Sequence, residues 1–208
     1  MIKRTDNVLP NLLDFTLEEM EEFISSLGKE KFRARQIMKW LHQSGSVSFE
    51  DMTTLSRDFR EKLSAIARIR RPEIVKILTS QDGTKKALLH LEDDLFIESV
   101  LIPGKNHWTL CISTQAGCAM GCAFCLTARQ DLKRNLTPAE IVGQMIALKH
   151  ETPEGAAINN IVMMGMGEPL ANYANTLKSI QILTCDFGLG MSNRRITVST
   201  CGLAPQII

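Results

Sequence analysis

The stretch Trp108-Thr-Leu-Cys-Ile-Ser-Thr-Gln-Ala-Gly-Cys-Ala-Met-Gly-Cys-Ala-Phe-Cys125 decides how the rest of the chain is interpreted. It begins as a strand pattern and ends in Cys118, Cys122 and Cys125, with the spacing Cys-x3-Cys-x2-Cys. Free cysteine is often a core residue, but three in one short loop beside glycines indicate a shared ligand. A four-iron cluster normally takes four thiolates, so three leave one iron open to an external ligand. The spacing therefore predicts a [4Fe–4S] cluster with an open iron.

Zinc is the main alternative metal for this loop. Zinc sites favour repeated Cys-x2-Cys pairs with a fourth cysteine or histidine. Here only Cys122 and Cys125 form such a pair, and His107 lies upstream at an unusual spacing. A c-type haem needs Cys-x2-Cys-His, whereas Leu126 follows the last cysteine. The pattern favours iron, and metal analysis distinguishes the two metals.

Composition and charge exclude several classes of protein. The 208 residues are 44% hydrophobic and 23% charged, which is ordinary for a globular protein. No apolar run approaches the roughly 18 residues that suggest a membrane span, and no secretory leader is recognisable. Six cysteines in such a chain predict a reducing cytoplasm and no membrane association. The pI of about 7.6 means that any RNA binding must depend on local basic patches.

Helical periodicity dominates residues 1–71. Thr16 and Glu19 form a predicted capping box at the start of the first helix, because each side chain is placed to bond the other residue's backbone N–H. We expect a small helical N-terminal domain that is separate from residues 72–208. Three helices are predicted, over residues 14–27, 32–42 and 55–67.

From residue 72 the pattern changes first to strands and then to alternating strands and helices. Such alternation predicts a parallel α/β sheet or barrel. It stops within a unit at Ile208, so we expect the chain to be a fragment or to be completed by a partner. Strands are predicted over residues 74–79, 85–91, 95–102, 108–113, 161–164 and 195–199. Helices are predicted from Thr137 to about His150, over residues 173–186 and after Gly202.

A second set of candidate ligand-binding residues follows the apolar strand at 161–164. The sequence Met164-Gly-Met-Gly-Glu-Pro169 is compatible with a simple tight turn. In a parallel sheet, however, Glu168 would lie at the same edge as the cysteine loop and could accept hydrogen bonds from an ammonium group. Ser199 ends the next strand and is also placed for a ligand. Phe124 is either a core aromatic residue or a contact for an adenine-bearing ligand on the open iron.

Longer motifs connect these residues to a known family. The pattern Cys-x3-Cys-x-Phe-Cys resembles the signature of the radical S-adenosylmethionine superfamily. Four stretches resemble one of its branches, the large-subunit rRNA adenine-C2 methyltransferases with dual specificity for rRNA and tRNA: residues 111–118, 134–141, 162–169 and 194–200. The helical N-terminal region fits this branch as well, so the resemblance covers nearly the whole chain.

The resemblance implies a fold and a cofactor site. The fold would be the first three units of a six-unit (β/α) barrel, preceded by the helical domain and a β-hairpin extension. Cys118, Cys122 and Cys125 would hold the [4Fe–4S] cluster, with S-adenosylmethionine chelating its open iron. The residues implied to bind S-adenosylmethionine are Phe124, Gly167, Glu168 and Ser199.

The resemblance also implies a reaction. A methyl group first moves to a carrier cysteine, and a 5′-deoxyadenosyl radical then abstracts hydrogen from it before the carbon adds to adenine C2. Glu98 matches the family's proton acceptor, although an exposed strand carboxylate is an equally ordinary interpretation. Cys111 matches the cysteine that helps release product through a disulfide with the carrier. That carrier lies near the family's C-terminus and not within these 208 residues, so we expect the chain alone to be inactive.

Substrates and partners follow from the same resemblance. They are large-subunit rRNA, tRNA and an electron-donor protein such as a flavodoxin. Three alternatives remain open: an enzyme that methylates adenine C8, a plain electron-transfer iron–sulfur protein, and a zinc-dependent RNA-binding module. Basic residues that we expect near RNA are Lys29, Lys31, Arg33, Arg35, Lys39, Lys133, Arg134, Arg194 and Arg195.

Overall fold

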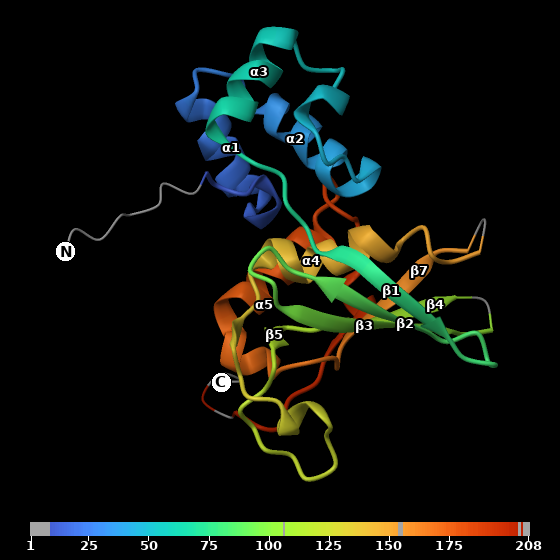
Figure 1. Cartoon of the computed structure of the whole chain (residues 1–208). Helices are drawn as coiled ribbons and strands as arrows, with labels where there is room; N and C mark the ends of the chain where they lie inside the picture. Colours follow the sequence, from blue (N-terminus) through green and yellow to red (C-terminus); the bar gives the residue numbers. More distant parts are fainter. Residues whose placement is uncertain (1–8, 106, 154–155, 204, 206–208) are drawn as a thin grey trace.

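The protein consists of a helical layer stacked on an α/β layer that contains one large sheet (Figure 1). The computed structural model describes residues 9–105, 107–153, 156–203 and 205. Helix α4 lies between the helical layer and the sheet. The buried apolar residues of both layers form one continuous cluster. The division at residues 71 and 72 remains a prediction.

The helical layer confirms the three predicted helices. The capping box is present, because Thr16 Oγ1 accepts a hydrogen bond from Glu19 N at 3.3 Å and Glu19 Oε2 accepts one from Thr16 N at 2.9 Å. The second helix departs from the prediction by continuing as a π-helix, which Gly45 ends with a φ of 70°. The elements are α1 (Leu17–Ser26), α2 (Phe32–Met38), the π segment Lys39–Ser44 and α3 (Arg57–Ile66), with 3-10 turns at Leu12–Asp14 and Phe49–Asp51.

The π segment contains a buried histidine, His42, from which we predict that the stability of the protein depends on pH. Neither ring nitrogen of His42 has a hydrogen-bond partner within the described residues, and burial lowers its pKa from 6.5 to about 4. The unfolded chain takes up this proton below pH 6.5 while the folded chain does not. The contribution of His42 to the free energy of unfolding should therefore be constant well above pH 6.5 and should fall by roughly 3 kcal/mol as the pH approaches 4. Urea denaturation at several pH values measures this slope.

A matched variant isolates the contribution of this histidine. His42→Leu removes the titrating group while it keeps an apolar side chain in the buried position. We expect the variant to lose this part of the pH dependence, because no proton uptake at residue 42 remains. An unchanged slope between pH 6.5 and 4 in the variant would assign the effect to other groups.

The large sheet has six strands in the order β1-β2-β3-β4-β7-β8. Neighbours from β1 to β4 are antiparallel, whereas β4-β7 and β7-β8 are parallel. The structure thus confirms the hairpin extension followed by parallel β/α units. The strands are β1 (Glu73–Thr79), β2 (Lys85–His90), β3 (Phe96–Pro103), β4 (Trp108–Cys111), β7 (Ile158–Met163) and β8 (Ile196–Val198). A separate pair consists of β5 (Gln115–Ala116) and β6 (Arg134–Asn135).

Two helices cover one face of this sheet and leave the other face open. They are α4 (Pro138–Leu148) and α5 (Tyr173–Thr184), which begin close to the predicted residues. Thr137 and Glu140 form the expected capping box of α4. Strand residues with one parity, such as Leu110 and Ile161, are fully buried on the covered face. Side chains of the opposite parity are available to a ligand.

The helical layer also caps a helix of the other layer. The Asp14 carboxylate accepts a 2.8 Å hydrogen bond from the backbone N–H of Ala139, in the first turn of α4. A carboxylate is favourable there because the N-terminal N–H groups of a helix lack partners within it. Among the described residues, no helix is long and apolar enough to cross a membrane. The helix predicted after Gly202 falls largely on residues outside the described ones.

Candidate cofactor and cluster site

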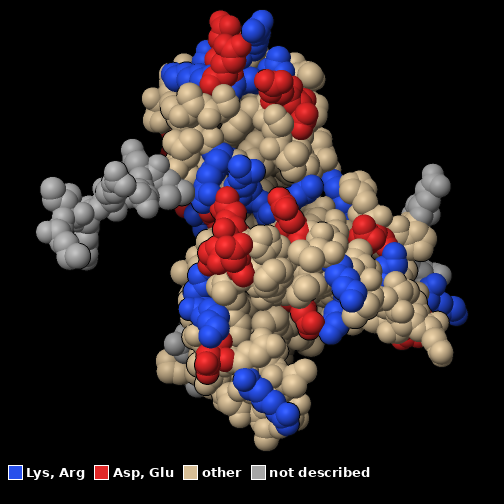
Figure 2. Space-filling model, in the orientation of Figure 1, with Lys and Arg blue, Asp and Glu red and all other residues tan. Residues whose placement is uncertain are grey.

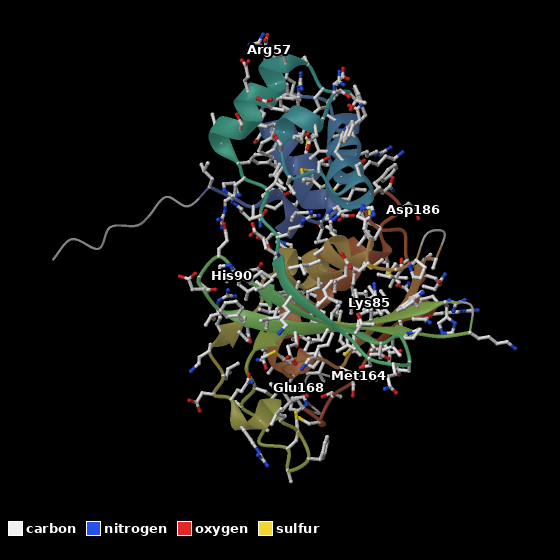
Figure 3. All side chains as sticks on the ribbon, turned by 45° about the vertical axis from the view of Figure 1, so that its right-hand side comes forward. Arg57, Lys85, His90, Met164, Glu168 and Asp186 are labelled. Carbon is white, nitrogen blue, oxygen red and sulfur yellow. The ribbon has the colours of Figure 1, made fainter. Side chains whose placement is uncertain are left out.

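The segments that follow β4 and β7 are joined at the carboxyl edge of the parallel strands. Gly165 N donates to Ile112 O at 3.0 Å, and Thr114 N donates to Met166 O at 2.8 Å. In Figure 3, Met164 and Glu168 lie on the side of the sheet turned away from the helical layer. The start of the cysteine loop and the Gly-Glu-Pro turn therefore meet as the sequence predicts. Sheets of this kind place ligands at this edge.

Gly167 is required at this junction for two reasons. Its φ of +100° lies in the region that favours glycine, and a Cβ atom there would lie 2.5 Å from Gln115 Cβ. The neighbouring residue is held directly, because Glu168 N donates to Gln115 Oε1 at 2.8 Å. The absence of a side chain thus allows the two segments to touch.

Gly167→Ala should lower the free energy of unfolding by at least about 2 kcal/mol, because it combines a strained φ with a clash against Gln115. Gly190→Ala is the matched control, since Gly190 has a φ of +64° but nothing within 4 Å of its added Cβ. Urea denaturation of both variants measures the difference. Equal losses in the two variants would mean that the close packing at residue 167 is unimportant.

Glu168 is almost completely buried, with 4% of its surface exposed. Its Oε1 accepts from Leu170 N at 2.9 Å and its Oε2 accepts from Cys201 N at 2.8 Å. Burial raises the pKa of this carboxyl, but the hydrogen bonds from Cys201 and Leu170 outweigh it and lower the pKa overall. The carboxylate therefore stays ionised and already has two donors. Besides these two backbone donors, the side chains of Thr200 and Cys201 also hydrogen-bond to the carboxylate and lower its pKa.

The three cysteines lie on one loop between β5 and β6, at the bottom of Figure 1. Gly117 closes the base of this loop, because a Cβ there would lie 2.2 Å from Asp131 O. Cys118, Cys122 and Cys125 are all half-buried. Within the described residues, however, no three His, Cys, Asp or Glu side chains are gathered at one point. Metal ligands are often brought together only when the metal group binds. The cluster-binding role of the three cysteines therefore stays a prediction.

Glu98 and Cys111 share the open face of the sheet. Cys111 pairs with Val100, two residues from Glu98 on β3, so all three side chains have the same parity. The Glu98 carboxylate also forms a 3.0 Å ion pair with Lys86, and its side chain is 46% exposed. Burial raises the pKa of the Cys111 thiol. The proposed roles of both residues stay predictions.

The disulfide predicted for Cys111 is not supported. All six cysteines lie among the described residues, and each is a free thiol. The partner implied by the family resemblance is a carrier cysteine that these 208 residues do not include.

The remaining predicted ligand residues, Phe124 on the cysteine loop and Ser199 after β8, are exposed. Phe124 is 94% exposed, which excludes the alternative that it is a core aromatic residue. Ser199 is exposed and directly follows β8, whose neighbour is β7. An exposed aromatic side chain such as Phe124 is suited to contact the flat ring of a ligand. Their contact with a cofactor stays a prediction.

The basic residues do not form one dominant patch on the face shown in Figure 2. Figure 2 shows Lys and Arg interspersed with Asp and Glu over the face in view. The guanidinium of Arg134 is already paired within the protein, because it forms ion pairs with Asp93 and Glu140 that raise its pKa. Lys31 and Arg35 both approach Glu21, at 3.4 Å and 3.6 Å. A role of Arg134 in RNA contact is therefore disfavoured, and that of the others remains a prediction.

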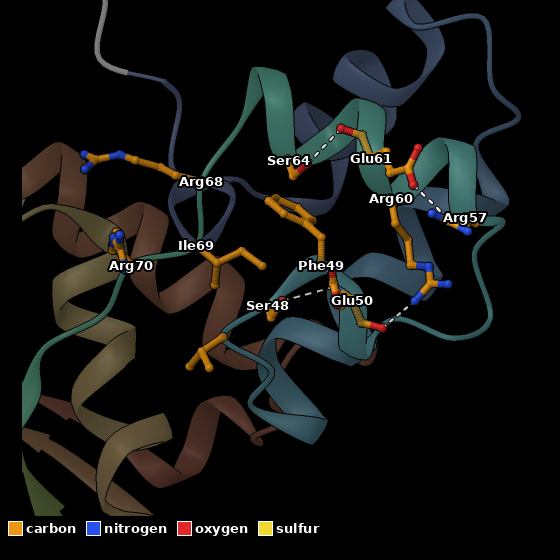
Figure 4. Close-up of a pocket in the computed structure, with 11 residues that line it drawn as sticks. Ser48, Phe49, Glu50, Arg57, Arg60, Glu61, Ser64, Arg68, Ile69 and Arg70 are labelled. Atoms are coloured by element: carbon orange, nitrogen blue, oxygen red, sulfur yellow. Dashed lines mark hydrogen bonds and ion pairs between the residues drawn. The ribbon is translucent and has the colours of Figure 1, made fainter.

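One pocket lies elsewhere, in the helical layer (Figure 4). Its volume is about 500 Å³, and its lining includes Phe49, Ser64 and Ile69. Arg57 pairs with Glu61 at 2.8 Å. The arginines at its rim point away from the centre in the close-up, so they do not converge on an anion. This pocket is remote from the cysteine loop, and we assign it no function.

Two buried amides at the site were not anticipated from the sequence. Gln115 holds Glu168, as described above, and Asn172 Nδ2 donates to the carbonyls of Thr114 and Leu136, both at 2.8 Å. Their partners depend on tertiary contacts that spacing alone does not specify.

Comparison with known proteins agrees with this geometry. Residues 10–69 match the family described as ribosomal RNA large subunit methyltransferase N-terminal domain, and residues 112–208 match the radical SAM superfamily. A protein of Syntrophus aciditrophicus (strain SB), named dual-specificity RNA methyltransferase RlmN, is 62% identical over 197 residues. A protein with the same name from Geotalea uraniireducens (strain Rf4) is 51% identical over 197 residues. These alignments cover 95% of this chain but 57% and 56% of the two relatives.

A solved structure gives the same result. The crystal structure of a radical SAM methyltransferase from Sphaerobacter thermophilus matches with a TM-score of 0.88 and 40% identity, over 95% of this chain and 59% of that one. The chain thus spans a little more than half the length of the relatives it matches. It has the N-terminal domain of the branch followed by a radical SAM region. The chain belongs to the radical SAM superfamily and, within it, to the family of the RlmN methyltransferases.

Proposed function

We propose that a protein that contains this chain and has the full length of its relatives is a radical SAM enzyme. Its proposed reaction is the methylation of adenine C2 in large-subunit rRNA and in tRNA. The observation that carries this proposal is the contact, at one sheet edge, between the Gly-Glu-Pro turn and the segment that leads into the cysteine loop. The names of the relatives, which are dual-specificity RNA methyltransferases, support the same class of substrate.

The donor set at this edge fits the implied cluster. Cys118, Cys122 and Cys125 supply three thiols on a loop that Gly117 closes, which leaves one iron without a protein ligand. When bound, the cluster supplies the electron that cleaves S-adenosylmethionine. Gly167 would expose backbone to the methionine part, and the negative charge of the ionised Glu168 carboxylate would attract the amino group. Phe124 and Ser199 complete the cofactor site.

Two residues on the open face of the sheet would act on the RNA adduct. Glu98 would accept the proton from the adenine carbon, because its carboxylate is accessible on the open face. Cys111 lies beside it as a free thiol. Its thiolate would attack the carrier sulfur, so that a disulfide forms while the bond from that sulfur to the methylated base breaks, and the electron pair of the broken bond takes up a proton on the new methyl group. The residues of the helical layer position the RNA, and a small electron-transfer protein such as a flavodoxin supplies the electron.

Mass spectrometry of RNA tests the proposal. Protein of full family length, with reconstituted cluster, reductant and S-adenosylmethionine, should convert adenosine in rRNA and tRNA fragments to 2-methyladenosine. The 208 residues alone should give none, because the carrier cysteine is not among them. Exclusive formation of 8-methyladenosine would contradict the proposed position, and no methylated adenosine from the full-length protein would contradict the activity.

A further inference from the structure

Gln144 is a fully buried amide in the middle of α4 with every hydrogen-bonding position in use. Its Oε1 accepts from Ser99 Oγ at 2.7 Å and from Ser113 N at 2.8 Å. Its Nε2 donates to Ser113 O at 2.9 Å and to Glu140 O at 3.2 Å. One side chain thus pairs both the N–H and the C=O of Ser113, as a neighbouring strand would.

Ser113 in turn connects the two halves of the proposed site. Its hydroxyl donates to the backbone carbonyl of Glu98 at 2.7 Å and accepts from the backbone N–H of Met166 at 2.8 Å. Glu98 is the proposed proton acceptor, and Met166 lies directly before Gly167 and Glu168. The backbone of three site segments is therefore held through a single buried hydroxyl.

We propose that Gln144 is a positioning residue that sets the distance between the Glu98 strand and the S-adenosylmethionine-binding turn by holding Ser113. This inference rests on the proposed function of that turn. Glutamine suits this position because its amide carries an acceptor oxygen and a donor nitrogen on the same carbon, which match the N–H and C=O of Ser113. Its removal leaves Ser99 and both backbone groups of Ser113 buried without partners, which favours opening of the site.

The experiment compares three variants of the full-length protein. Gln144→Met keeps the volume and helix propensity but removes the amide. Ser113→Ala keeps the contacts of Gln144 to the backbone but cuts the bridge between Glu98 and Met166. Ile146→Ala on the same helix is the control, because Ile146 is a buried apolar residue with no part in this network. The readouts are local hydrogen exchange without cofactor and the affinity of the reconstituted protein for S-adenosylmethionine.

We expect Gln144→Met to speed exchange in residues 112–116 and 164–168 and to weaken S-adenosylmethionine binding about tenfold, with unchanged iron content. Ser113→Ala should show the same effects to a smaller extent, whereas Ile146→Ala should lower the melting temperature without either effect. Exchange or affinity in Gln144→Met and Ser113→Ala that changes no more than in Ile146→Ala would overturn the inference. Failure of the unmodified protein to bind S-adenosylmethionine would instead contradict the proposed function, and the exchange data would still decide the role of Gln144.

Discussion

Replacement of Cys118, Cys122 or Cys125 with serine is expected to remove most of the bound iron and sulfide and to abolish activity of the full-length protein. Each thiolate would supply one of only three protein bonds to the cluster. Serine has the same shape but is a poor ligand for iron in such clusters. The measurement is iron and sulfide per chain after anaerobic purification, together with the visible absorption of the protein.

Cys185→Ser is the matched control for these variants. Cys185 is also a half-buried free thiol, but it caps the end of α5 and not the cysteine loop. We expect its iron content to equal that of the unmodified protein. Retention of full iron content after substitution of any one of the loop cysteines would contradict the assigned ligand set.

Glu98→Gln is expected to lower the rate of RNA methylation by about 10²- to 10⁴-fold in the full-length enzyme while leaving the binding of S-adenosylmethionine unchanged. Glutamine keeps the shape of the side chain but cannot take up a proton at neutral pH. The ion pair with Lys86 provides the competing, purely structural explanation. Single-turnover assays of product formation measure the effect.

Lys86→Met separates the two explanations. It removes the ion-pair partner at 3.0 Å but leaves the Glu98 carboxylate in place. An exposed pair of this kind contributes little stability, so we expect the variant to keep most of its methylation rate. If Lys86→Met were as slow as Glu98→Gln, the ion pair and not proton acceptance would be the function of Glu98.

Much of the fold could be predicted because its signals are local. The capping boxes at Thr16 and Thr137 depend on residues three positions apart, and both form as expected. The alternation of strand and helix after residue 108 predicted the parallel pairing of β4, β7 and β8. Once these strands are parallel, their carboxyl ends share one edge, which brings the cysteine loop to the Gly-Glu-Pro turn.

The features that could not be predicted depend on contacts between distant residues. Gln144 looks like an ordinary helix residue, and only the packed structure reveals that it pairs with Ser113, which is 31 residues away. Glu168 was expected to accept hydrogen bonds from a ligand, but its carboxylate already accepts them from the backbone N–H groups of Leu170 and Cys201. Arg134 was expected near RNA and is instead paired with Asp93 and Glu140. In each case a polar group finds its partner through the tertiary fold.

The central claim is that three cysteines of this chain hold an iron cluster whose open iron binds S-adenosylmethionine. Electron paramagnetic resonance of the reduced, anaerobically purified protein, recorded before and after the addition of S-adenosylmethionine, tests it most directly. We predict the signal of a reduced [4Fe–4S] cluster that changes when the cofactor is added, because the cofactor alters the coordination of one iron. Protein without iron, or a cluster signal that the cofactor leaves unchanged, would contradict the claim.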